Sequence, residues 1–120
     1  MTDAGVLIQL PATRADGRVV DHVAIVTINR PAVLNALTGA LMNQLVSVLE
    51  GLDADPDCHV AVIRGAGERA FAAGADIREM AHLTPDSAGL TDTFAPWARL
   101  PRVRMPMIAA VRGYALGGGC

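Results

Sequence analysis

The hydrophobic positions of this chain fall into two patterns, one typical of strands and one typical of a helix. Short apolar runs bounded by turn-forming residues predict strands. There are four such runs: Val6–Leu10, Val23–Ile28, Val60–Ile63 and Met107–Val111. Between the second and the third run, apolar residues recur at the spacing of one helical face, at Leu41, Leu45, Val48, Leu49 and Leu52. This spacing predicts a helix over Thr38–Leu52 that packs on the strands, with Thr38 as its N-cap.

The residues between and after the runs indicate how the strands connect. Ala15–Arg18, with the sequence ADGR, is a turn signal between the first two runs, so the chain is predicted to begin with a β-hairpin. Pro31 ends the second strand, because proline cannot continue a hydrogen-bonded ladder. The last two runs are apolar throughout, which predicts that both of those strands are buried.

The rest of the chain is less regular. Phe71–Ala75 is predicted to be a short strand or an extended turn, and Asp76–Leu83 is predicted to be a helix. Asp76 stands three residues before Glu79, which is the spacing of a capping box. Thr84–Arg104 is divided by prolines and a glycine, so one or two short helices are expected there. The order of the elements predicts an α/β fold made of repeated ββα units.

Two turns rich in small residues follow predicted strands, at Ala72–Ala75 and at Gly117–Gly119. Residues with little or no side chain leave their backbone N–H groups open to close approach by another group. Two N–H donors that converge on one carbonyl oxygen form an oxyanion hole, which stabilises negative charge as it develops on that oxygen. We therefore predict an oxyanion hole built from these two turns.

Composition limits the class of protein. Apolar residues make up 52% of the 120 positions and charged residues 18%, so we expect the chain to be part of something larger than a small self-contained domain. The net charge is −2 and the cations form no basic stripe, which argues against a nucleic-acid partner. With two distant cysteines, no leader pattern and no apolar run of membrane-spanning length, we expect a soluble cytoplasmic protein.

Other motifs with a possible chemical meaning have simpler explanations. Gly65 and Gly67 follow a strand, as in a dinucleotide-binding fingerprint, but the next segment is strand-like and not the helix that the fingerprint requires. A P-loop needs a lysine, and the chain has none. His22, His59 and His82 lack the spacing of a metal site or of a catalytic triad, so we expect them on the surface or in turns.

Four residues near the two turns each have two interpretations. Cys120 has no histidine placed by a motif to activate it, so a small buried thiol is favoured over a nucleophile. Asp76 is either an acid/base group or a helix cap, and its spacing to Glu79 favours the cap. Arg69 and Arg78 flank the first turn and are either solvated surface residues or partners of phosphate groups, which arginine binds well.

Three stretches, taken together, resemble the crotonase superfamily, the enoyl-CoA hydratase/isomerase family. They are VAIVTINRPAVLNALT at residues 23–38, FAAGADI at 71–77 and IAAVRGYALGGGC at 108–120, and they stand in the family's order. The resemblance runs from Val23 to Cys120. It implies a crotonase-like (ClpP/crotonase) spiral of ββα units. Because family members are longer, residues 1–120 would be the N-terminal part of one such domain.

The resemblance also implies a reaction, the addition of water across the 2,3-double bond of an acyl-CoA thioester in fatty-acid β-oxidation. By motif position the oxyanion donors are the N–H groups of Ala75 and Gly118. Ala36 and Ile77 would line the path of the thioester and pantetheine. The substrate-binding residues that it implies are Ala36, Arg69, Ala75, Asp76, Ile77, Arg78 and Gly118. It implies no cofactor and no metal, because the acyl-CoA is itself the substrate.

The sequence departs from the family pattern in one respect. In the family's hydratases a glutamate follows GGGC and a second lies further on, and these two position and activate the water. Neither is present in residues 1–120. We therefore expect these residues alone to lack measurable hydratase activity. We also expect them to associate or aggregate, because an apolar strand and a glycine turn are left uncovered. The family's trimers and hexamers form largely through later residues, so a proper oligomer is not expected. A non-catalytic CoA-binding or subunit-interaction protein is an alternative, as are the family's isomerase and thioester hydrolase activities.

Overall fold

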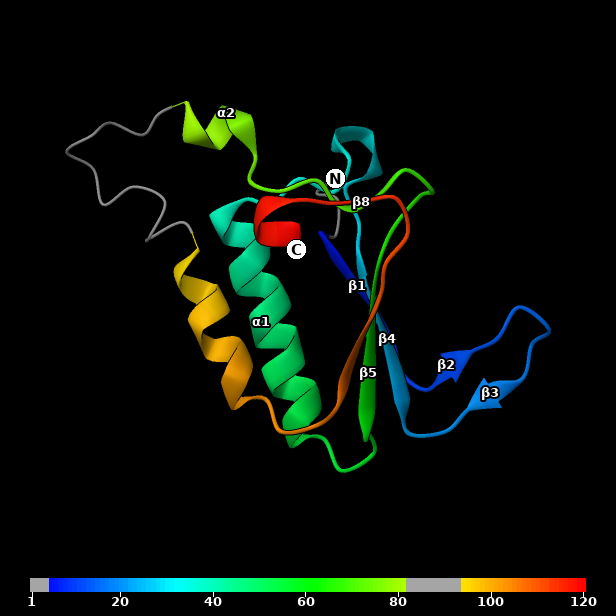
Figure 1. Cartoon of the computed structure of the whole chain (residues 1–120). Coiled ribbons are helices and arrows are strands. Elements are labelled where there is room, and N and C mark those ends of the chain that lie inside the picture. The colour runs from blue at the N-terminus through cyan, green and yellow to red at the C-terminus, as the bar shows by residue number, and fades with distance from the viewer. Residues whose placement is uncertain (1–4, 82–93) are drawn as a thin grey trace.

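A four-stranded sheet with helices on one face organises the chain (Figure 1). The structure is a computed structural model that describes residues 5–81 and 94–120. The strands of the sheet, in their spatial order, are β1 (Val6–Gln9), β4 (Val23–Ile28), β5 (Val60–Gly65) and β7 (Met107–Ala110). β1 runs antiparallel to β4, whereas β4, β5 and β7 run parallel to one another. All four strands predicted from the apolar runs are therefore confirmed, with shifts of one or two residues at their ends.

The predicted hairpin at the start of the chain is also confirmed. β1 pairs with β4, and the connection between them holds a smaller ladder of β2 (Ala12–Thr13) and β3 (Val19–Val20). The predicted turn forms the tip of that ladder, where the amide of Arg14 donates to the carbonyl of Arg18 at 2.8 Å.

Helix α1 (Gly39–Ala54) begins at the predicted N-cap, because the Thr38 hydroxyl accepts the amide of Leu41 at 3.0 Å. The helix lays its apolar face on the sheet. The buried side chains of that face are Leu41, Met42, Leu45, Val46, Leu49 and Leu52. All of them except Val46 meet the buried strand residues Ala24, Val26, Ile28 and Ala61 in one core. Each large side chain removed from water in this way contributes about 1.5–3 kcal/mol.

The prediction that the last strand is buried is wrong. β7 lies at the edge of the sheet, and Ile108 is 53% exposed. Only β5 pairs with it among the described strands, so its apolar side chains have neighbours on one side. An all-apolar run does not distinguish a central strand from an edge strand, which is why the pattern misled.

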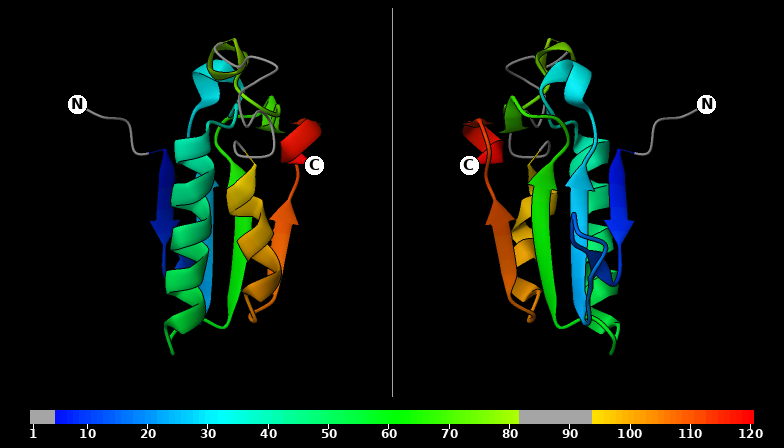
Figure 2. Two further views of the ribbon diagram at one scale, coloured as in Figure 1. Left: turned by 90° about the vertical axis from the view of Figure 1, so that its left-hand side faces the viewer. Right: turned by 90° about the vertical axis from the view of Figure 1, so that its right-hand side faces the viewer.

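A 3₁₀ helix, η2 (Ala95–Arg102), lies beside α1 on the same face of the sheet (Figure 2). Arg99 joins the two helices, since its guanidinium donates to Glu50 of α1 at 2.6 Å and to Asn43 at 2.9 Å. The expectation of a short helix between Thr84 and Arg104 is confirmed for residues 95–102, whereas residues 84–93 lie outside the described part of the chain.

A second, two-stranded parallel ladder joins β6 (Ala70–Ala72) to β8 (Tyr114–Ala115). Three short helices surround it: η1 (Pro31–Val33), α2 (Ile77–Met80) and η3 (Gly117–Gly119). The strand predicted over Phe71–Ala75 is thus present in part, and α2 begins where the sequence predicts; His82 and Leu83 lie outside the described residues. No helix of the described residues is long and apolar enough to cross a membrane.

Only half of the predicted capping box forms. The Asp76 carboxylate accepts the amide of Arg78 at 2.9 Å, as an N-cap should. Glu79, however, accepts the amide of Gly39 at 2.9 Å instead of reaching back to Asp76. The reason is that the Asp76 amide already donates to the Leu37 carbonyl at 2.8 Å. Glu79 therefore links α2 to the first turn of α1.

Candidate functional site

The two small-residue turns lie against each other, backbone to backbone. The amide of Leu116 donates to the Ala72 carbonyl at 3.1 Å. A methyl group on Gly74 would lie 3.1 Å from the Leu116 carbonyl oxygen, and one on Gly119 would overlap the carbonyl oxygen of Ala72. Larger residues would separate the two segments, so the glycines are required for this close approach. The expectation that the turns belong to one site is consistent with this packing.

The first turn leaves the Ala75 amide facing away from its strand neighbour. Leu37 pairs with the residues on either side of Ala75: its amide donates to the carbonyl of Gly74 at 2.7 Å, and its carbonyl accepts the amide of Asp76 at 2.8 Å. Because successive residues of an extended chain point their amides to opposite edges, the Ala75 N–H points away from Leu37. Within residues 5–81 and 94–120 it donates no hydrogen bond.

The second turn ends in η3, and Gly118 is one of its first residues. The bonds of η3 run from Gly119 to the Leu116 carbonyl at 2.8 Å and from Cys120 to the Gly117 carbonyl at 3.0 Å. The first amides of a helix have no partner inside it. In the described part of the chain the Gly118 amide accordingly donates to no other group. Ala75 and Gly118 are thus both half-buried residues whose amides donate no hydrogen bond to any other described residue.

Arg30 connects three of the predicted site residues, and it was not predicted as part of the site. Its guanidinium donates to the Ala36 carbonyl at 2.6 Å and to the Asp76 carboxylate at 3.2 Å. The same carboxylate accepts the amide of Arg78. Burial by itself would raise the pKa of Asp76, but the Arg78 amide and the Arg30 guanidinium outweigh it, so the pKa lies below its ordinary value. Asp76 is therefore an ionised structural group, as the cap interpretation predicts.

Asn35 is a second residue that the sequence analysis missed. It is fully buried, and its side chain accepts the Arg30 amide at 2.8 Å and donates to the carbonyls of Ala66 and Ala70 at 3.0 and 2.8 Å. Its φ of 55° lies in the left-handed region, which asparagine tolerates better than most residues. An isolated asparagine among apolar neighbours carries no periodic signal, so only the structure reveals that it joins three segments.

The remaining predicted residues are on the surface. Ile77 is 81% exposed, and the side chains of Arg69 and Arg78 are also exposed. Arg69 lies just before β6, where its carbonyl accepts the amide of Tyr114 at 3.1 Å. The structure thus brings Ala36, Asp76, Ile77 and Arg78 next to Ala75, whereas Arg69 stands at the other end of the β6 segment.

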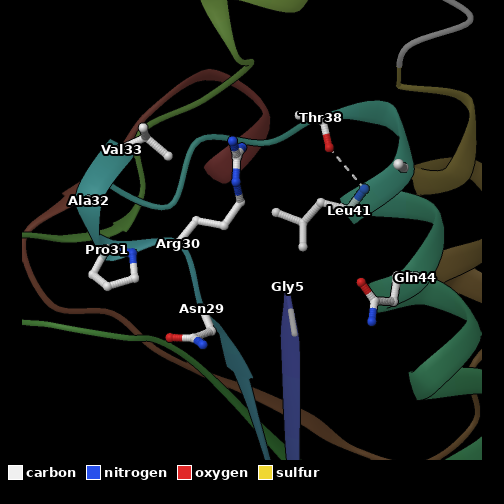
Figure 3. Close-up of a pocket in the computed structure, with 10 residues that line it drawn as sticks. Gly5, Asn29, Arg30, Pro31, Ala32, Val33, Thr38, Leu41 and Gln44 are labelled. Carbon is white, nitrogen blue, oxygen red and sulfur yellow. Dashed lines mark hydrogen bonds between the residues drawn. The ribbon is translucent and has the colours of Figure 1, made fainter. Parts of the chain in front are cut away.

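The predicted oxyanion donor Gly118 lines one cavity, and a wider pocket lies elsewhere, beside Arg30. An apolar cavity of about 260 Å³ lies between the sheet, α1 and η2, and Gly118, Gly119 and Cys120 form part of its wall. A wider pocket of about 590 Å³ lies beside Arg30 and the first turn of α1, where Figure 3 shows the Thr38–Leu41 hydrogen bond. None of the predicted site residues lines that wider pocket, so it carries no support for the predicted chemistry.

The expectation about Cys120 is wrong, whereas the one about the histidines is confirmed for His22 and His59. Cys120 is exposed, not buried, because it follows η3 at the surface; Cys58 is the buried thiol. His22 and His59 are exposed as expected, but their rings stack with centroids 4.2 Å apart. No group of three or more histidine, cysteine or acidic residues in the described segments could hold a metal ion.

Sequence comparison decides the family. The model of the enoyl-CoA hydratase/isomerase family matches residues 18–120. The chain belongs to the enoyl-CoA hydratase/isomerase family. It is 55% identical over 99 residues to a probable enoyl-CoA hydratase of Mycobacterium tuberculosis, and 52% identical over 100 residues to the 2,3-dehydroadipyl-CoA hydratase of Escherichia coli. Each alignment covers 82% of this chain and 38% of the relative. The chain thus spans about two fifths of the length of these family members.

Solved structures of family members confirm the predicted crotonase fold. An enoyl-CoA hydratase subunit from Geobacillus kaustophilus superposes with a TM-score of 0.81 at 40% identity, covering 97% of this chain and 41% of that one. An enoyl-CoA hydratase from Mycobacterium tuberculosis superposes with a TM-score of 0.71 at 32% identity, covering 98% of this chain and 41% of the other.

Proposed function

We propose that residues 1–120 form the N-terminal part of one crotonase-like domain and carry the thioester-binding, enolate-stabilising half of an enoyl-CoA hydratase site. The supporting observation is the packing of the two turns, which leaves the amides of Ala75 and Gly118 without partners among the described residues. The names of the relatives support a hydratase.

The proposed chemistry uses these two amides at one oxygen. When water adds at C3 of a 2,3-unsaturated thioester, the electron pair of the double bond moves to the thioester oxygen and forms an enolate, which then takes a proton at C2. Donors fixed at that oxygen bind the enolate more strongly than the neutral carbonyl, and this difference lowers the barrier. Loss of one such donor typically costs about 2.7–4 kcal/mol.

The proposed substrate is an acyl-CoA of fatty-acid β-oxidation. The thioester and pantetheine would pass Ala36 and Ile77. Ile77 follows Ala75 by two residues, and Ala36 precedes Leu37, the residue that pairs with Ala75. The exposed guanidinium of Arg78 or Arg69 would meet the phosphates of CoA. A cytoplasmic location, the absence of a cofactor and a trimeric or hexameric assembly belong to the same proposal, by analogy with the family.

A second candidate is a protein that binds CoA thioesters without hydrating them. It is favoured by the state of Asp76 and Glu79, the two carboxylates that follow Ala75 in the chain. Asp76 is bonded to Arg30 and Arg78, and Glu79 is bonded to the amide of Gly39. Neither is free to deliver water, so within the described residues the donors have no adjacent general base.

An activity-free experiment separates the two candidates. Acetoacetyl-CoA forms an enolate that absorbs in the ultraviolet, and oxyanion donors stabilise that enolate when the thioester binds. We expect residues 1–120 to lower the apparent pKa of bound acetoacetyl-CoA relative to the free thioester. Ala75→Pro, which removes one N–H, should reduce the shift, while Ala75→Gly, which keeps the N–H, should preserve it. Binding without any shift would favour the second candidate.

Two further measurements complete the test. The same protein should not hydrate crotonyl-CoA at a measurable rate, followed by loss of the conjugated absorbance, and turnover would contradict the assignment of Asp76 and Glu79 to structural roles. If neither acetoacetyl-CoA nor crotonyl-CoA binds in calorimetric titrations, both candidates are wrong.

A further inference from the structure

Trp97 lies on η2, 21 residues before Gly118, and its indole meets the glycine turn directly. The Nε1–H donates to the Gly118 carbonyl at 3.0 Å. We propose that Trp97 is a positioning residue for the oxyanion site: it fixes the orientation of the Gly118 residue and thereby the direction of its N–H. This inference rests on the proposed function, because it concerns how one of the two donors is held.

The glycine turn needs such an anchor. Three consecutive glycines have no side chains that restrict their backbone, so many orientations of each peptide group are accessible. The hydrogen bonds of η3 fix the amides of Gly119 and Cys120 but not the carbonyl of Gly118. A hydrogen bond from outside the turn to that carbonyl removes this freedom, and Trp97 supplies it.

A second aromatic ring confines the same residue. A methyl group added at Gly118 would overlap the ring of Phe94, whose Cε1 is its nearest neighbour. The chain contains four aromatic residues of the Phe, Tyr and Trp types, and two of them lie against this one glycine. Phe94 thus restricts the Cα of Gly118 sterically, while Trp97 orients its carbonyl through a directional bond.

The segment that carries Trp97 is itself held in place. Two residues further on, Arg99 binds Glu50, Asn43 and Ser47, which lie on one face of α1. Trp97 and Leu100 also pack against the hydrophobic core and line the apolar cavity under η3. The helix η2, which carries the indole, is therefore bound to α1 on one side and to the glycine turn on the other.

The hydrogen bond can be observed directly, since Trp97 is the only tryptophan of the chain. A ¹H–¹⁵N correlation spectrum of residues 1–120 contains one indole resonance, which needs no assignment. We expect this N–H to exchange with solvent markedly more slowly than that of free tryptophan, and the resonance to shift when acetoacetyl-CoA binds. An indole N–H that exchanges as fast as in the free amino acid would overturn the proposal.

A pair of variants tests the consequence for the site. Trp97→Phe keeps an aromatic ring but removes the donor, and we expect bound acetoacetyl-CoA to ionise about two- to tenfold less favourably than in the unsubstituted protein, the range of one hydrogen bond. Leu52→Ala removes core packing near the end of α1, from a residue that does not line the cavity beside Gly118, so it should lower the melting temperature and leave the ionisation unchanged.

The outcomes distinguish this inference from the function on which it rests. No pKa shift in the unsubstituted protein contradicts the proposed function. If the unsubstituted protein lowers the pKa of bound acetoacetyl-CoA and Trp97→Phe lowers it equally, the positioning role is contradicted. An equal reduction in Trp97→Phe and Leu52→Ala means that general loosening is responsible, which also contradicts it. Should Trp97→Phe fail to fold, the exchange rate of the indole N–H decides.

Discussion

The guanidinium of Arg30 lies 3.2 Å from the carboxylate of Asp76, although 46 residues separate them in the chain. The pair joins the end of β4 to the start of α2, and Arg30 also holds the Ala36 carbonyl. Ala75, the predicted oxyanion donor, immediately precedes Asp76. This ion pair, with 29% of the Arg30 side chain and 11% of the Asp76 side chain exposed, therefore fixes one end of the first turn.

Substitution of Asp76 separates its charge from its role as a helix cap. Asparagine caps a helix about as well as aspartate, so Asp76→Asn removes only the pairing with Arg30. We expect Asp76→Asn to lower the free energy of unfolding by about 1–3 kcal/mol, since one partner of a partly exposed pair loses its counter-charge. Asp76→Ala should cost about 1 kcal/mol more, because the cap is also lost. Urea denaturation measures both: an Asp76→Asn protein as stable as the unsubstituted chain would show that the charge pairing contributes nothing, and equal costs for the two variants would show that the cap contributes nothing.

The same carboxylate predicts how stability depends on pH. The pKa of Asp76 in the folded chain lies below its ordinary value near 3.8, so its contribution is complete above that value and is lost as the pH falls through the lowered pKa. The melting temperature should therefore decline below about pH 4, and less steeply in Asp76→Asn than in the unsubstituted chain. Parallel declines in the two proteins would contradict this attribution.

Two glycines provide a matched pair for testing the packing. A methyl group at Gly65, the last residue of β5, would overlap the carbonyl oxygens of Ala70 and Phe71, which cannot move unless the whole β6 segment moves. Gly65→Ala should therefore destabilise the chain by about 2–3 kcal/mol. Gly51 lies inside α1 with open space around it, so Gly51→Ala should stabilise the chain by about 0.5–1 kcal/mol. Thermal denaturation that gives both changes the same sign would contradict the packing of β5 on β6.

The two cysteines should differ in reactivity. Burial raises the pKa of the Cys58 thiol, and the residue is in the core, whereas Cys120 is exposed. A thiol reagent at neutral pH should modify one cysteine of the folded chain rapidly and the second only on unfolding. Peptide mapping should locate the first label at Cys120. Fast labelling of both, or of Cys58 first, would contradict the core that joins Cys58 to Met105.

The sequence predicted the elements that local patterns determine. The recurrence of apolar residues at helical spacing predicted α1, with Thr38 as its cap, and the small-residue turns indicated where another group could approach the backbone closely. The exposure of β7 could not be predicted, because an apolar run says nothing about how many neighbours a strand has. Glu79 likewise binds Gly39 and not Asp76, because a tertiary contact already uses the amide that a capping box would need.

For the site, the motif resemblance supplied the predicted residues, whose roles stay predictions, and long-range contacts show residues that no motif indicated. Arg30, Asn35 and Trp97 act on partners between 5 and 46 residues away, through directional bonds that leave no periodic trace in the sequence. Gly65 illustrates the same point: the sequence analysis weighed it as part of a nucleotide-binding motif, and the structure explains it by the close approach of Ala70 and Phe71.

The central claim is that the amides of Ala75 and Gly118 donate to one thioester oxygen. Isotope-edited infrared spectroscopy of crotonyl-CoA labelled with ¹³C at the thioester carbonyl measures the polarisation of that bond in the complex with residues 1–120. The account predicts a carbonyl stretch at lower frequency than that of the free thioester in water, with a smaller shift for Ala75→Pro and an unchanged one for Ala75→Gly. A bound thioester whose carbonyl absorbs at or above the frequency in water would contradict it.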